Sequence, residues 1–455
     1  MKVKQLKMKN FRGFDDITID FEPNEPTIFV GINGSGKSSI LDGLVFLLFV
    51  LVLNKNIIYL QENTKPISIV RLNRNKEREK SHVSNIKNEI QNGKENVEIE
   101  IEVNMYSESL KWGLMAKHHE DSKVTWDFSQ KESITILKEK INNQVKENKK
   151  NNIPLAIYYP IHRTFSESYL DEGKSDYKSL FNQFSAYKHM LDNNKNNFIS
   201  FFNDYKSLEE LEYEGLKKDR EYQDPYLKGI QDAVYTFLNG FSSFQVRRIN
   251  TKNIPQMIIE KKGKMLSLDQ LSEGEKCLLA MVGDLARRLA IANPGRDNPL
   301  EGEGIVLIDE IELHLHPQWQ RSIIKNLTKT FPNCQFIVTT HSPQVISEVR
   351  QVHLLHETDD GKIICDPIRT YGKDSNMILE TLMGTVRRSQ DIQDDLDRLF
   401  ELIGDEKIAE AKALKVKIED KVGTRIPELA RADWAITDLE IMQEEDETDS
   451  QTKST

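Results

Sequence analysis

A glycine-rich loop between a strand pattern and a helix pattern is the feature that most constrains how this chain folds. Residues 31–38 read Gly-Ile-Asn-Gly-Ser-Gly-Lys-Ser, which fits the pattern G-x-x-x-x-G-K-[ST]. The run Thr27–Val30 before the loop is typical of a central strand that is covered on both faces. The apolar run Leu44–Leu53 after it is too short to span a bilayer, and we read it as a buried helix. A strand, a glycine loop and a helix in this order predict an α/β fold.

The loop predicts a phosphate-binding site. Its glycines let backbone N–H groups converge on phosphates, and the N-terminus of the following helix adds positive potential. We expect Lys37 to reach the β and γ phosphates of ATP, and Ser38 to bind Mg²⁺. A chance glycine turn is the alternative, and the flanking strand and helix disfavour it. The other expected nucleotide contacts in the loop are Asn33, Gly34, Ser35, Gly36 and Ser39.

An acidic pair follows the apolar run Gly304–Ile308, which predicts a second buried strand. Phosphoryl transfer needs one carboxylate to hold Mg²⁺ and another to polarise water. We therefore assign Asp309 to the metal and Glu310 to catalysis. An acidic pair after a strand is usually only the start of a helix. It indicates a catalytic site here because of its position in the chain relative to the other motifs.

Two further motifs complete that order. The segment Leu271–Lys276 reads Leu-Ser-Glu-Gly-Glu-Lys before a helical pattern, and its residues also suit an ordinary helix cap. The segment Thr339–Pro343 contains His341 and ends a third buried-strand run, Gln335–Thr339. A lone histidine in such a place is more often structural.

The order of loop, signature, acidic pair and histidine resembles that of ABC-type ATPases. The resemblance implies that Ser272 and Gly274 contact the γ phosphate of ATP held by another subunit. It also implies that the imidazole of His341 reads that phosphate. The turn Asn10–Phe14 belongs to the same resemblance, and we include its Arg12 among the nucleotide contacts. An ATP site shared between subunits predicts a homodimer or an assembly of dimers.

Residue patterns predict a mixed sheet flanked by helices, with a helical insertion and a C-terminal helical extension. Residues 3–8 and 16–21 alternate as a hairpin does, and Ile153–Pro160 is another buried strand. Residues 57–152 turn polar, which indicates an insertion with one strand at Val97–Val103 and a helix at Ile134–Lys149. We divide the chain into an ATPase core (1–165 and 251–375), a helical subdomain (166–250), C-terminal helices (376–442) and an acidic disordered tail (443–455).

Composition limits the environment and the partners. The net charge of -10 argues against an overall electrostatic grip on nucleic acid. The basic stretches Arg71–Arg78 and Arg247–Arg248 offer local phosphate contacts, although interspersed acids favour a solvated face. No signal peptide or membrane span is visible, so we expect a cytoplasmic protein. Three widely spaced cysteines indicate free thiols in a reducing compartment: Cys277, Cys334 and Cys365.

Departures within the motifs separate the ABC-type families. Transporters carry Gly-Gly-Gln where this chain has Glu273–Glu275, and SMC proteins need long coiled coils between loop and signature. Nucleases of the overcoming-lysogenization-defect type add a Toprim domain, whereas the residues after 376 look helical here. The chain resembles the PtuA ATPases of Septu antiphage systems, which also occur beside some retrons. That likeness runs through the turn, the loop, the signature, Asp309–Pro317 and the C-terminal helices.

The resemblance to PtuA implies a separately encoded partner, the HNH-type nuclease PtuB, whose cleavage the ATPase regulates. Contact with nucleic acid would then come through the complex. Two alternatives remain: a repair ATPase that resembles RecF and acts directly on DNA, and a nucleotide-locked scaffold that hardly turns over. Zinc binding by His314 and His316 is disfavoured because no third ligand is evident. The glutamine that links Mg²⁺ to the helical lobe is left open between Gln61 and Gln91.

Overall fold

The computed structural model separates into two compact units, Met1–Ile378 and Leu379–Thr455, which are described one at a time. The structure describes residues 1–51, 69–72, 78–81, 90–91, 93–118, 124–147, 152–161, 182–188, 190–191, 196–248, 255–385, 388–423 and 426–452.

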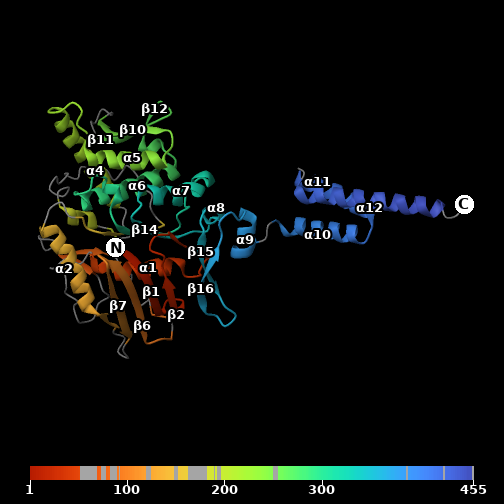
Figure 1. Ribbon diagram of the computed structural model, residues 1–455, viewed down its shortest axis with the longest axis horizontal. Coiled ribbons are helices and arrows are strands. Elements are labelled where there is room, and N and C mark those ends of the chain that lie inside the picture. The colour runs from red at the N-terminus through yellow and green to blue at the C-terminus, as the bar shows by residue number, and fades with distance from the viewer. Residues whose placement is uncertain are drawn as a thin grey trace. The chain divides into compact units, whose positions relative to one another are not determined.

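A six-stranded mixed sheet carries most of the sequence motifs (Figure 1). Its strands, in spatial order, are β16 (Ile363–Arg369), β15 (Gln351–Glu357), β3 (Thr27–Val30), β14 (Cys334–Thr339), β13 (Gly304–Ile308) and β9 (Leu155–Tyr159). Strands β15, β3, β14, β13 and β9 run parallel, and β16 pairs antiparallel with β15 at the edge. Every residue of β3, β9, β13 and β14 is buried, as the four continuous apolar runs predict.

A second, antiparallel sheet has the order β2-β1-β6-β7-β8. Its strands are β1 (Lys2–Phe11), β2 (Phe14–Asp20), β6 (Asn96–Met105), β7 (Glu108–His118) and β8 (Val124–Ser129). The predicted hairpin of β1 and β2 is confirmed. The predicted insertion with a single strand is wrong, because β6 pairs directly with β1 and continues into β7 and β8. These strands bury only one face, so their outward lysines and glutamates make the segment look polar overall.

Helix α1 (Lys37–Leu48) follows the glycine loop and packs between the two sheets, and the short helix η1 (Phe49–Leu51) continues it. The indole N–H of Trp112 on β7 donates to the carbonyl of Leu47 over 2.9 Å, which ties the end of α1 to the antiparallel sheet. The buried helix predicted over Leu44–Leu53 is confirmed as far as Leu51, and residues 52 and 53 lie outside the described residues.

Helices cover the other face of the mixed sheet, and a three-stranded sheet accompanies them. The elements are α4 (Asn196–Leu216), α5 (Pro225–Phe237), α6 (Glu273–Ala292), β10 (Phe241–Arg248), β11 (Pro255–Lys261) and β12 (Lys264–Ser267). The helices α4 and α5 fit the predicted helical subdomain, but its boundary at residue 250 is wrong. Strand β10 pairs with β11 across that boundary. A local residue pattern does not predict which strands pair with each other.

A buried charge network joins α6 to its neighbours. The Arg287 guanidinium donates to Asp284 over 2.6 Å and to Asp204 on α4 over 2.7 Å, and Arg288 Nε donates to Asp284 over 2.7 Å. The hydroxyl of Tyr159, at the end of β9, also donates to Asp284. Burial alone would raise the pKa of Asp284, and the two guanidinium groups hold this pKa below its ordinary value. Two cations and two anions balance one another, so the network fixes the position of α6 without a net buried charge.

Further elements lie in the described part of the first unit. They are β4 (Ile69–Leu72), β5 (Arg78–Ser81), α2 (Lys131–Glu147), η4 (Gln183–Tyr187), η5 (Leu268–Gln270), η6 (Pro299–Glu301), α7 (Pro317–Thr330) and α8 (Pro343–Ile346). Helix α9 (Ser375–Met383) extends from the first unit into the second. The helix predicted over Ile134–Lys149 corresponds to α2 within the described residues.

After the end of α9, the described part of the second unit contains α10 (Gln390–Gly404), α11 (Ile408–Val422) and α12 (Pro427–Thr452). Their buried side chains are Leu396, Leu399, Leu402, Ile403, Ala411, Ile418, Leu429, Ala432 and Ile436. The predicted helical extension is confirmed, but the disordered tail is wrong for residues 443–452, which belong to α12. Glutamate and glutamine favour helix, and no glycine or proline interrupts the segment. Among the helices of the described residues, none is long and apolar enough to cross a bilayer.

Candidate nucleotide site

The phosphate loop lies between β3 and the first turn of α1. Gly34 and Gly36 have φ values of 84° and 94°, a left-handed conformation that glycine adopts without strain. A Cβ at Gly36 would lie 2.4 Å from the ring of Phe14, so this position also requires glycine for space. Gly36 is the N-cap, and α1 has no acidic residue in its first turn. The positive end of α1 is therefore not countered by a side chain of its own helix, which suits a phosphate group.

Lys37 is buried, and its ammonium group donates to two carbonyls of the loop. The distances are 3.0 Å to the oxygen of Gly31 and 2.9 Å to that of Ile32. Burial lowers the pKa of Lys37, while the carboxylates of the β13 end oppose this shift. The ammonium thus binds the first two residues of the phosphate loop. In loops of this type the lysine at this position contacts the phosphates.

Ser38 and Asp309, the two residues predicted to bind Mg²⁺, are in direct contact. The hydroxyl of Ser38 donates to Oδ1 of Asp309 over 3.2 Å, and Asp309 is only 3% exposed. The Asp309 N–H donates to the carbonyl of Tyr159 over 2.9 Å, so β9 and the network on α6 support its position. A hydroxyl and a carboxylate are oxygen ligands of the kind that Mg²⁺ prefers, and the residues present fit that ion.

Thr339 at the end of β14 connects the Asp309 carboxylate to the backbone of Glu310. Its hydroxyl donates to Oδ1 of Asp309 over 2.5 Å and accepts from the N–H of Glu310 over 2.8 Å. Glu310 has a φ of 46° and comes directly after the buried strand. No sequence motif marks this role of Thr339, but its place at the carboxyl end of the adjacent buried strand is a signal that predicts it.

His341 lies on the loop after β14, and Glu312 holds that loop. The carboxylate of Glu312 accepts from the N–H of His341 over 2.5 Å and from the hydroxyl of Thr340 over 2.8 Å. Burial lowers the pKa of His341, and Lys37 lowers it further. The imidazole is therefore held in its neutral form near pH 7. This role of Glu312 is not among the predicted ones, and its position two residues after Glu310 is the sequence signal for it.

Arg12 lies in the turn between β1 and β2 and contacts the first turns of α1. Its guanidinium donates to Ser39 Oγ over 3.2 Å and to Asp42 over 2.7 Å. The turn is thereby attached to the helix that begins at the phosphate loop. Asn33 at the tip of the loop is exposed, whereas Ser35 is buried.

The signature segment begins α6. Ser272 is the N-cap of that helix, and its hydroxyl and N–H form a capping box with Glu275. A Cβ at Gly274 would lie 2.4 Å from the carbonyl oxygen of His314, so the glycine permits close packing against the loop after β13. The capping role of Ser272 is thus present in the single chain. The contact of Ser272 and Gly274 with ATP on another subunit stays a prediction.

The remaining candidate residues have ordinary surroundings. His316 is the N-cap of α7, where its Nδ1 accepts from the N–H of Gln318 over 3.3 Å. The N–H of Gln91 donates to the carbonyl of Asn10 over 3.0 Å, beside the turn that contains Arg12. Gln61 lies outside the described residues, as do the side chains of Arg71–Arg78, and Arg247 is exposed.

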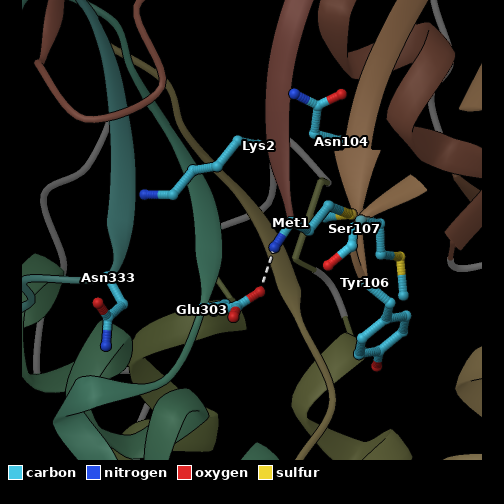
Figure 2. A pocket seen from close by; sticks show the side chains of 8 residues that line it. Met1, Lys2, Asn104, Tyr106, Ser107, Glu303 and Asn333 are labelled. Atoms are coloured by element: carbon cyan, nitrogen blue, oxygen red, sulfur yellow. Dashed lines mark hydrogen bonds and ion pairs between the residues drawn. The ribbon is translucent and has the colours of Figure 1, made fainter. Parts of the chain in front are cut away.

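A hollow of about 190 Å³ lies away from these motifs, at the start of β1 (Figure 2). Its lining consists of Met1, Lys2, Asn104, Met105, Tyr106, Ser107, Glu303 and Asn333. The amino group of Met1 forms an ion pair with Glu303, so two of its charges already neutralise each other. The lining contains no residue of the phosphate loop, the acidic pair or the signature.

A phosphate loop, a paired carboxylate site and a neighbouring histidine, gathered at one edge of a mixed sheet, define a P-loop ATPase of the ABC type. Residues 27–347 match the family described as "AAA domain, putative AbiEii toxin, Type IV TA system". This match spans well over half of the chain. The chain belongs to this family.

Individual relatives narrow the assignment. The Retron Vc95 probable ATPase of Vibrio cholerae serotype O1 biovar El Tor is 30% identical over 444 residues, covering 86% of this chain and 81% of that protein. The Retron Ec83 probable ATPase of Escherichia coli is 29% identical over 481 residues, covering 91% and 82%. The Septu protein PtuA of Bacillus mycoides (strain KBAB4) is 30% identical over 173 residues, covering 35% and 24%. The chain is thus an ATPase of the type found among retron and Septu PtuA proteins.

Solved structures with a related arrangement are distant in sequence. The SMC head domain from Thermotoga maritima has a TM-score of 0.42 and 14% identity, covering 81% of this chain and 100% of that one. An SMC head bound to the C-winged helix domain of ScpA has a TM-score of 0.45 and 14% identity, covering 81% and 98%.

Proposed function

We propose that the chain is an antiphage-defence ATPase whose nucleotide site, shared between subunits, regulates a separate HNH-type nuclease resembling PtuB. One observation carries the ATPase part: Thr339 joins Asp309 to Glu310 while Ser38 donates to the same Asp309 carboxylate. Similarity to retron ATPases and to Septu protein PtuA supports the role in defence. In this arrangement nucleic acid is reached through the complex, and the protein acts in the cytoplasm.

The site residues divide the work of ATP hydrolysis. Glu310 accepts a proton from water as the water oxygen forms a bond to the γ phosphorus, and the bond from that phosphorus to the β-γ bridging oxygen breaks. Lys37 and the N-terminus of α1 stabilise the phosphate charge, and neutral His341 donates a hydrogen bond to the γ phosphate. Mg²⁺, held by Ser38 and Asp309, supplies charge neutralisation when bound.

A second subunit completes the site in this proposal. Ser272 and Gly274 open α6 on that subunit and contact the γ phosphate, so ATP binding couples to association of two copies. The close packing of Gly274 against the carbonyl of His314 supports the coupling, because His314 follows the acidic pair by only a few residues. Hydrolysis then changes the surface that both subunits present to the nuclease.

Replacement of the catalytic carboxylate tests the ATPase part. Glu310→Gln keeps the shape of the side chain but cannot accept a proton, so phosphate release should fall at least about 100-fold. ATP-dependent association should persist or become tighter. Glu357→Gln changes an exposed carboxylate on β15 and serves as the matched control. Unchanged phosphate release in Glu310→Gln would favour a nucleotide-locked scaffold.

Purification from the native operon tests the nuclease part. A tagged chain should retain the product of a neighbouring HNH nuclease gene in a defined ratio, and the ratio should depend on the nucleotide supplied. If no nuclease is recovered and the chain alone binds DNA tightly and in a salt-sensitive way, the result would favour the alternative, a repair ATPase that resembles RecF and acts directly on DNA.

A further inference from the structure

The outward face of α12 carries side chains that its own unit leaves uncovered. Trp434 is 80% exposed and Ile441 is 51% exposed. Leu429 and Ala432 point the other way, into the core of the unit. At about 100° per residue, Trp434 lies on the side of the helix opposite to this core face. Such exposure is unusual for tryptophan, which is enriched at the centres of protein interfaces.

The exposed row has a regular spacing. Its members are Ala430, Trp434, Thr437 and Ile441, all of which are exposed. They follow one another at intervals of four, three and four residues, which is the spacing of the contact positions in a two-stranded coiled coil. The helix therefore has two faces for packing, one used within the unit and one left for another helix.

We infer that this face pairs with α12 of a second copy of the chain, with the two helices antiparallel. In that orientation Trp434 lies opposite Thr437, and Ile441 lies opposite Ala430. Each large side chain thus faces a small one, which lets the helices pack without a gap or a clash. The contact is isologous, because each helix contributes the same row to a two-fold axis.

In the antiparallel orientation, charged side chains beside the exposed row of one copy face opposite charges on the other copy. Arg431 and Asp438 flank Trp434 on one edge, and both are exposed. Antiparallel pairing places Arg431 of each copy beside Asp438 of the other, which gives two opposite-charge contacts. Within residues 427–442, the part of α12 whose side chains are described, the other carboxylates have partners in the unit, in the pairs Arg388–Glu428, Lys415–Asp433 and Lys412–Glu440.

This contact needs no nucleotide, and it does not depend on the proposed ATPase mechanism. If ATP also joins subunits at the shared site, each chain has two different two-fold contacts. Repetition of two such contacts builds assemblies of dimers rather than isolated dimers. Only this last step rests on the proposed function.

The mass of the full-length chain without nucleotide tests the inference. Light scattering at several concentrations should show a dimer, and Lys37→Ala should show the same dimer because no ATP is involved. Trp434→Glu should weaken association at least tenfold. Tyr371→Glu alters an aromatic residue of the first unit that is 72% exposed, and this variant should leave the dimer unchanged.

Charge reversal tests the orientation. Arg431→Asp and Asp438→Arg should each weaken the dimer several-fold, and the double variant should restore it. Circular dichroism confirms that each variant keeps its helices. A monomeric wild type, or a Trp434→Glu variant that still dimerises, would overturn the inference, and so would binding of a different protein through Trp434 without self-association. If Trp434→Glu loses the nucleotide-free dimer but still associates when ATP is added, the α12 contact and the proposed shared ATP site are independent of each other.

Discussion

The hydroxyl of Ser38 lies 3.2 Å from Oδ1 of Asp309, although 271 positions separate the two residues in the chain. The parallel pairing of β3, β14 and β13 brings the phosphate loop and the acidic pair to one edge of the sheet. Thr339, at the end of the strand between them, holds the Asp309 carboxylate from its other side. The proposed Mg²⁺ site thus depends on the strand order as much as on the motifs.

The first prediction concerns Thr339. Thr339→Val keeps nearly the same volume but removes the hydroxyl that joins Asp309 to the Glu310 N–H. ATP turnover should fall about 10- to 100-fold, as it does when groups that orient metal ligands are lost. The Mg²⁺ concentration for half-maximal phosphate release should rise. Thr339→Ser retains the hydroxyl and should recover most of the activity; equal loss in both variants would show that packing, not the hydrogen bonds, matters.

The second prediction concerns Lys37. Lys37→Ala removes a buried ammonium that donates to the Gly31 and Ile32 carbonyls, the group expected to face the phosphates. Affinity for ATP, measured by titration with a fluorescent analogue, should fall about 10- to 100-fold because charge-assisted contacts are lost. Lys7→Ala changes an exposed lysine on β1 and should bind as the wild type does. Equal affinity in the two variants would remove Lys37 from the site.

A third prediction separates the two roles of Ser272. Asparagine is as good an N-cap as serine, so Ser272→Asn should leave thermal stability nearly unchanged. If Ser272 also contacts ATP on another subunit, the bulkier amide should reduce ATP-dependent association and turnover about tenfold or more. Sedimentation with and without ATP measures the association. Full turnover in Ser272→Asn would leave the residue with its capping role alone.

The fourth prediction is a pH dependence of stability. Burial raises the pKa of Glu209 on α4 from 4.5 to about 7, while its carboxylate accepts from the Val246 N–H over 2.8 Å. A raised pKa in the folded state gives stability that is complete below pH 4.5 and is lost as the pH rises through 7. When the pH rises from 5.5 to 8, the free energy of unfolding of the wild type should fall by about 2 kcal/mol more than that of Glu209→Gln.

Urea unfolding of both proteins at the two pH values measures this difference. Glu260→Gln changes a glutamate of β11 and serves as a control for the loss of one negative charge. A difference between wild type and Glu209→Gln that does not vary with pH would show that Glu209 ionises normally.

Local patterns in the sequence were sufficient for the phosphate loop, the four buried strands and the C-terminal helices. Each of these is encoded by neighbouring residues: glycines at fixed spacing, continuous apolar runs, or one apolar helical face. The expected roles of Lys37, Ser38 and Asp309 come from the same local motifs, and the structure places these residues near one another as the motif order implies.

The other features of the fold and of the candidate site depend on contacts between segments that are distant in the sequence. Strands β7 and β8 join the core because β6 pairs with β1, and Thr339 and Glu312 gain their roles because β14 ends beside β13. The exposure of Trp434 likewise depends on which face of α12 the other helices cover. A single stretch of sequence specifies its own periodicity, but contacts between distant stretches arise only when the whole chain buries its apolar surface together.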